Sequence, residues 1–105
     1  MLRVKAEIIF TIEGKNYKNG KHPLSPAFRF ADGLAFSGDI KSEYPEYVYN
    51  QKYIVDIEFF TINSEAYEAI KPLIKKGMNL TISTARSILG LSKVLDFDYV
   101  EDAAA

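Results

Sequence analysis

The chain contains no cysteine and only one histidine, and these two shortages exclude several kinds of chemistry. Without cysteine the protein has no disulfide, no thiol nucleophile and no need of an oxidising compartment. The single histidine, His22, leaves no second imidazole for a zinc site, and the acidic residues do not follow the spacing of a calcium loop. His22 also lies in a polar loop, and no serine elbow is present, so we interpret it as a solvated or loop-bracing residue. We therefore expect a protein that is not an enzyme and holds neither a metal nor another cofactor.

Long apolar runs and a phosphate-binding loop are missing as well. No stretch approaches the roughly 18 consecutive apolar residues of a membrane-spanning helix, and the start of the chain lacks the features of a signal peptide. The P-loop pattern of nucleotide-binding proteins is absent. A proline separates Glu43 from Glu46 and nothing nearby desolvates them, which favours a solvated acidic loop over a catalytic carboxylate pair. These observations predict a cytoplasmic protein without a membrane contact.

The composition is that of one ordinary globular domain. Of 105 residues, 48% are hydrophobic and 26% are charged, and seven Phe with seven Tyr are enough to stabilise a core without disulfide or metal. The net charge of −1 provides no global attraction to nucleic acid. We expect a single domain over residues 1–100, followed by a flexible tail at 101–105.

Alternation of apolar and polar residues, the pattern of half-buried strands, dominates the chain. Strands are expected at residues 4–13, 27–31, 34–40, 52–62, 78–83 and 85–95. Asp32 and Gly33 suit the tight turn of a hairpin between the second and third of these strands. In the strand at 52–62, we predict that the face with Tyr53, Val55, Ile57 and Phe59 points into the core.

One segment, residues 64–77, has helical rather than strand periodicity. Asn63 or Ser64 can cap its start, and Gly77 can provide a left-handed end. Pro72 inside a helix removes a hydrogen bond and clashes with the preceding turn, at a cost of about 3 kcal/mol. We therefore predict a short helix to about residue 71, followed by a second turn that begins at Pro72.

These elements predict an all-β fold: a closed six-stranded antiparallel barrel with one short helical insertion. Closure is expected because an open sheet of this size exposes two long edges, and the chain has few prolines or inward charges to protect them.

The order of several short motifs resembles the C-terminal barrel domain of translation elongation factor Tu. The motifs are Ala6-Glu7-Ile8, Pro26-Ala27-Phe28-Arg29-Phe30, Gly38-Asp39-Ile40, the strand at 50–60, and Arg86-Ser87-Ile88-Leu89-Gly90-Leu91-Ser92-Lys93-Val94. The resemblance runs from about Lys5 to Phe97 and implies the barrel of that factor without its GTPase domain. In that family the barrel contacts tRNA, the GTPase domain and the exchange factor, and only Arg86 stands on a matching basic position here.

Two segments are candidate protein interfaces: one is rich in tyrosine and the other is apolar. Tyr44, Tyr47 and Tyr49 lie together, and tyrosine is enriched in interfaces, although tyrosine rings also plug the ends of barrels. In the helical segment, Ile70, Leu73 and Ile74 are expected to point at the barrel or at a second subunit. The leading hypothesis is a stand-alone, non-enzymatic module that binds a protein partner, self-association included.

The alternative is an RNA-binding module. Lys15, Lys18 and Lys21 lie in a loop without an acidic residue and with an aromatic among them, which suits phosphate contacts and base stacking. Together with Arg86 they form the candidate RNA contact, and a solvated lysine loop is the other interpretation of this segment. A third hypothesis is an immunity or decoy protein that imitates the elongation factor.

Overall fold

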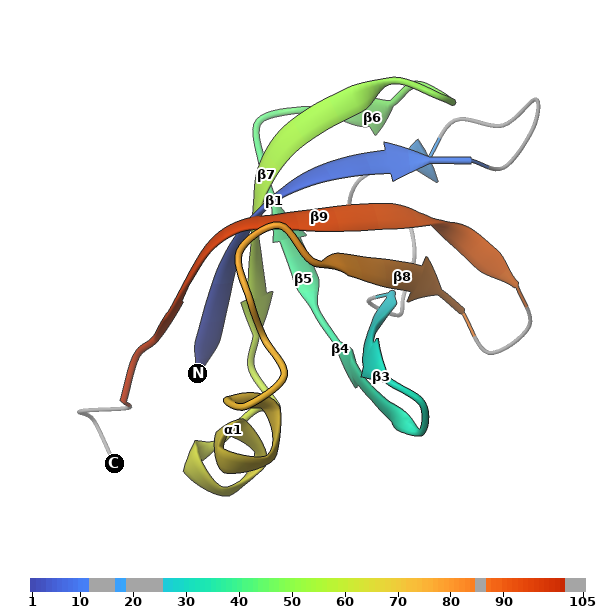
Figure 1. Ribbon diagram of the computed structural model, residues 1–105. Helices are drawn as coiled ribbons and strands as arrows, with labels where there is room; N and C mark the ends of the chain where they lie inside the picture. The colour runs from blue at the N-terminus through green and yellow to red at the C-terminus, as the bar shows by residue number, and fades with distance from the viewer. Residues whose placement is uncertain (12–16, 19–25, 85–86, 102–105) are drawn as a thin grey trace.

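The computed structural model describes residues 1–11, 17–18, 26–84 and 87–101. Its elements are β1 (Leu2–Phe10), β2 (Tyr17–Lys18), β3 (Ala27–Ala31), β4 (Leu34–Ser37), β5 (Asp39–Lys41), β6 (Glu46–Tyr47), β7 (Lys52–Phe59), α1 (Ser64–Ile70), β8 (Asn79–Ser83) and β9 (Ile88–Tyr99). Seven strands form one antiparallel sheet in the order β4-β3-β8-β9-β1-β7-β5, and β2 pairs with β6 in a second, small sheet. The large sheet curls strongly into an open half-barrel (Figure 1).

The concave side of the half-barrel holds the core. Strand β1 lies between β7 and β9 and alternates strictly, so its even-numbered residues from Leu2 to Phe10 are all buried. On β7, Val55, Ile57 and Phe59 are buried, which confirms the predicted inward face. The ring of Phe59 packs edge-on against Phe28 and Phe30 from β3, with centroids 5.3 and 5.5 Å apart.

The antiparallel architecture with one short helix is confirmed, but the sheet differs from the expected closed barrel of six strands. The predicted strand at 34–40 is divided at Gly38 into β4, which pairs with β3, and β5, which pairs with β7. These two strands are the opposite edges of the sheet. A Cβ atom at position 38 would lie 2.7 Å from Ile57 Cγ2 and 2.8 Å from Phe59 Cε1. The chain is therefore pressed against the core at Gly38, where it passes from one edge of the sheet to the other.

The local predictions for the turn and the helix are confirmed. The hairpin between β3 and β4 turns at Gly33, which has a φ of 75°. At the start of α1, Asn63 Oδ1 accepts a hydrogen bond of 2.9 Å from the amide of Ala66. After Ile70 the chain makes one further turn, in which the amide of Ile74 donates to the carbonyl of Ile70 at 2.9 Å.

The position of α1 follows from its buried residues. The helix lies at the end of the half-barrel where β1 begins and β7 ends (Figure 1). Ile70 and Ile74 from this segment belong to the same core cluster as the strands. The helical insertion therefore covers one end of the curled sheet.

Candidate interaction surfaces

The small sheet joins the two loops that the sequence marks as candidate contact surfaces. Strand β2 belongs to the basic loop and β6 to the tyrosine-rich segment, and they pair with Tyr17 opposite Tyr47 and Lys18 opposite Glu46. Strands of two residues are too short to have a recognisable pattern, so this pairing was not expected from the sequence. The backbone of Tyr17 and Lys18 therefore lies next to the tyrosine-rich segment.

A cluster of three tyrosines, Tyr44, Tyr47 and Tyr53, occupies one end of the half-barrel. Tyr44 and Tyr53 pack edge-on with ring centroids 4.8 Å apart, and Tyr47 lies 5.1 Å from Tyr53 and 5.4 Å from Phe10. Tyr47 is fully buried, so it acts as a plug for the end of the half-barrel. Tyr44 is 42% exposed, and its ring rests on the other two. Tyr49 is half-buried.

Hydrogen bonds hold the cluster in place. Ser42 Oγ bonds the hydroxyl of Tyr47 and accepts from the amide of Tyr44 at 3.2 Å. The hydroxyl of Tyr53 accepts from the amide of Val48 at 2.8 Å. Burial raises the pKa of Tyr47 above that of an ordinary tyrosine, although the hydrogen bond with Ser42 lowers it in part. The buried hydroxyl of Tyr47 therefore stays neutral, and the cluster is a rigid base beneath the exposed ring of Tyr44.

The residues of the helical candidate interface divide into two groups. Ile70 and Ile74 are buried in the core of their own chain, whereas Leu73 is 38% exposed. Ile70 and Ile74 therefore point at the half-barrel, which is one of the two expected directions. Leu73 is the member of this set whose side chain another protein can reach.

Most of the candidate RNA-contacting residues lie outside the described part of the chain. This holds for Lys15, Lys21 and Arg86, as it does for His22, and Lys18 is described only as a backbone position in β2. The described neighbours of Arg86 are nevertheless informative, because the amide of Thr11 donates to the carbonyl of Leu89 at 2.9 Å. The end of β1 and the start of β9 thus meet. The RNA alternative requires the four basic side chains to converge on one side of the molecule.

The convex face of the sheet carries apolar side chains that sequence reasoning missed. Ile9 on β1 lies opposite Leu91 on β9, and Ile54 on β7 lies opposite the preceding outward residue of β1, Glu7. Ile54 and Leu91 are exposed. The sequence does contain a sign of this face, because apolar residues stand at the outward-facing positions of these strands, where the alternating pattern predicts polar ones.

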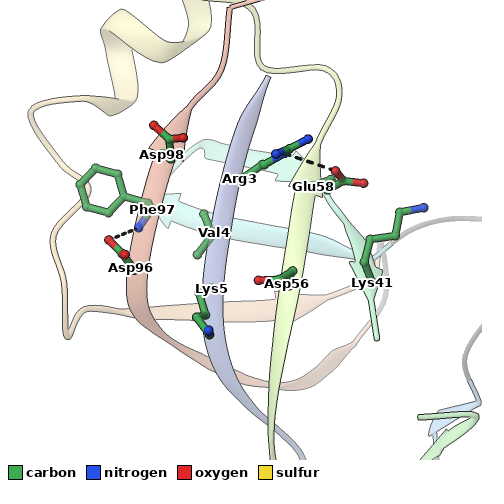
Figure 2. A pocket seen from close by; sticks show the side chains of 9 residues that line it. All are labelled: Arg3, Val4, Lys5, Lys41, Asp56, Glu58, Asp96, Phe97 and Asp98. Atoms are coloured by element: carbon green, nitrogen blue, oxygen red, sulfur yellow. Dashed lines mark hydrogen bonds and ion pairs between the residues drawn. The ribbon is translucent and has the colours of Figure 1, made fainter. Parts of the chain in front are cut away.

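Toward the start of β1, the exposed side chains on the convex face are charged rather than apolar. Figure 2 shows Arg3 and Lys5 on β1 between Asp96 and Asp98 on one side and Asp56 and Glu58 on the other. Together with Val4, Lys41 and Phe97, these side chains line a shallow groove of about 460 Å³. Arg3 Nε lies 3.5 Å from Glu58 Oε2, and Lys76 pairs with Asp96 at the same distance.

A second, more apolar pocket of about 420 Å³ lies between the end of β7 and the end of β9. Its walls are Met1, Phe60, Ile62, Asn63, Tyr99, Val100 and Glu101. Phe60 is 59% exposed, although it is one of the largest apolar side chains in the protein. On the opposite wall, Tyr99 packs against Tyr67 of α1 with ring centroids 4.5 Å apart.

Comparison with known proteins identifies no relative. No family model matches the chain, and neither a curated protein nor a solved structure is similar enough to be matched to it. Among the described residues, no group of three or more His, Asp or Glu side chains is arranged to hold a metal ion. The helix in this part of the chain is too short and too polar to cross a membrane.

Proposed function

We propose that this protein is a non-enzymatic, cytoplasmic module that binds a protein partner, and that Tyr44 is the centre of the contact. The observation that supports this proposal is the exposed ring of Tyr44 on a fixed base formed by Tyr47 and Tyr53. A large ring that is already held in one place loses little conformational entropy on binding. Such a ring is the usual anchor of a protein interface.

The proposal extends to the kind of fold. The half-barrel is a form of the six-stranded barrel of the elongation factor Tu C-terminal domain, in which residues 34–41 are one strand that bends at Gly38. Two observations support this: β4 and β5 are consecutive in the chain, and they form the two opposite edges of the sheet, where β4 pairs with β3 and β5 pairs with β7. A role related to translation is part of the same proposal, and it rests on the motif resemblance.

RNA binding is the second candidate function, supported by the pairing of β2 with β6. In this ladder the backbone of Lys18 pairs with that of Glu46 in the tyrosine-rich segment, and basic residues beside aromatic rings are typical of proteins that bind single-stranded nucleic acid. The net charge of −1 disfavours RNA binding, because contacts between basic residues and phosphates supply most of the affinity of nucleic-acid-binding proteins.

The test is capture of partners by the immobilised full chain from lysate, with and without nuclease. We expect a captured protein that survives nuclease, is lost with Tyr44→Ser, and is kept with Ile88→Ser, a matched removal of an exposed apolar side chain elsewhere on the sheet. Loss of the partner after nuclease treatment would favour the RNA alternative. Equal capture by the wild type and Tyr44→Ser would rule out Tyr44 as the contact.

A further inference from the structure

One edge of the large sheet lacks the usual protection against pairing with another chain. Strand β4 pairs with β3 on one side, and among the described strands none pairs with it on the other. From Leu34 to Ser37 it contains neither a charged residue nor a proline, the residues that commonly protect an edge. At the opposite edge, β5 is charged at two of its three positions, Asp39 and Lys41. The hairpin of β3 and β4 projects from the half-barrel (Figure 1).

The backbone groups of Ala35 and Ser37 point to this unpaired side. In an antiparallel pair, successive residues direct their N–H and C=O groups alternately to the two sides of the strand. The amide of Gly38 donates to the carbonyl of Pro26, just before β3, at 3.0 Å. Gly38 and Phe36 are therefore directed to β3, whereas Ala35 and Ser37 are directed away from it. Two amides and two carbonyls thus face the side where no described strand lies.

The side chains of β4 also suit an added strand. Leu34 and Phe36 pack against the core and are only half-buried, whereas Ala35 and Ser37 are exposed. The ring of Phe36 lies edge-on to that of Phe30, with centroids 6.1 Å apart. A strand beside β4 covers the exposed parts of Leu34 and Phe36, so that apolar contact is added to the backbone hydrogen bonds.

A second copy of β4 matches this edge in one register. When two copies pair antiparallel about a two-fold axis at Phe36, Ala35 of each copy lies opposite Ser37 of the other. All the outward backbone groups at these two positions then bond each other, because the same residues are directed outward in both strands. No like charges meet, since β4 has none, and the two Phe36 side chains lie opposite each other on the axis as a stabilising aromatic pair.

We propose that two copies of this protein associate through their β4 edges, so that the two large sheets become one sheet across the two-fold axis. This contact is separate from the Tyr44 site, which lies in the segment after β5. The pairing involves one short strand from each copy, so the dimer forms at high protein concentration and dissociates on dilution.

The first test is sedimentation equilibrium of the full chain at concentrations up to the order of 1 mM, where weak association is detected. We expect an equilibrium between monomer and dimer. Hydrogen exchange followed by NMR should show that the amides of Ala35 and Ser37 exchange more slowly as the dimer forms, because they become hydrogen-bonded. A monomer at every concentration would overturn the proposal, and so would a dimer in which these two amides exchange as fast as in the monomer.

Paired charge variants test the register. Ala35→Glu combined with Ser37→Glu places like charges opposite each other on both sides of the axis and should weaken the dimer about tenfold. Ala35→Glu combined with Ser37→Lys places opposite charges at the same positions and should keep or strengthen the dimer. Both side chains are exposed, so both double variants should fold like the wild type. Equal dimerisation of the two double variants would overturn the proposal.

Two further variants separate this contact from others. Tyr44→Ser should leave dimerisation unchanged, so that failure of this proposal and failure of the Tyr44 interface are observed separately. Leu73→Asp, on the turn after α1, should leave the dimer intact as well. Dissociation caused by Leu73→Asp would place the contact between copies at that turn and would overturn the assignment to β4.

Discussion

Tyr44 packs edge-on against Tyr53, with ring planes at 70° and centroids 4.8 Å apart. The two tyrosines lie on different sides of the turn that leads into β7, and the hydroxyl of Tyr53 is fixed by the amide of Val48. An exposed ring in a loop is ordinarily mobile. Here the contact with Tyr53 restricts it, which is why Tyr44 is the residue on which the proposed function depends.

The core assignment is tested by Phe59→Ala, which should lower the free energy of unfolding by about 3–5 kcal/mol because it leaves a cavity among Phe28, Phe30 and Ile57. The adjacent Phe60 is 59% exposed and serves as a matched control, because Phe60→Ala should cost less than about 1 kcal/mol. Urea denaturation of both variants measures the difference. Similar losses for the two would mean that the inward face of β7 is assigned to the wrong residues.

The bend between β4 and β5 is tested by Gly38→Ala. The added methyl group would overlap Ile57 and Phe59, and the resulting overpacking should cost about 1–3 kcal/mol. This loss outweighs the gain of about 0.4–1 kcal/mol that comes from stiffening the unfolded chain. Ser37→Ala, one residue earlier on the exposed side, should stay within about 0.5 kcal/mol. A stabilised Gly38→Ala variant in thermal melting would refute the close packing at this position.

The buried hydroxyl of Ser92 has no hydrogen-bond partner among the described residues. Since an unsatisfied buried polar group costs about 1–3 kcal/mol, Ser92→Ala should raise the free energy of unfolding, by about 1 kcal/mol. Chemical denaturation gives the sign of the change. Destabilisation by more than about 1 kcal/mol would mean that the hydroxyl makes a stabilising contact.

An introduced charge should lower stability strongly at Ile70, the last residue of α1, and hardly at all at Leu73 in the turn that follows. Ile70→Asp buries an unpaired carboxylate in the core and should cost at least about 3 kcal/mol. Leu73→Asp should leave the melting temperature nearly unchanged, because its side chain reaches solvent. If Leu73 lies in a contact between copies, sedimentation of Leu73→Asp will show dissociation. A large loss of stability for Leu73→Asp would contradict its exposed position.

The RNA alternative is tested by salt dependence, because phosphate contacts release counterions and lose affinity steeply as salt rises. We expect no detectable tRNA binding at physiological salt. We also expect that changing Lys15, Lys18 and Arg86 to Glu leaves the captured protein partners unchanged. Salt-sensitive tRNA binding that disappears in this triple variant would restore the RNA-contacting role to these residues.

Local rules in the sequence were sufficient for much of the fold. The alternation along β1 and β7, the hairpin turn at Gly33, and the helix that starts after Asn63 and ends before Pro72 were all predicted. Each depends on residues that are neighbours in the chain, so periodicity, capping and backbone preference determine it without reference to the rest of the molecule.

Contacts between distant segments decided the remainder. The division of one expected strand at Gly38 depends on Ile57 and Phe59, which press on the backbone there. Of three tyrosines close together in the chain, Tyr47 is buried because it meets Phe10 and Tyr53, while Tyr44 stays exposed. The sequence alone determined which residues are apolar and how they alternate. Only the tertiary structure decided which of them the curled sheet covers, because burial depends on the strand that arrives opposite each residue.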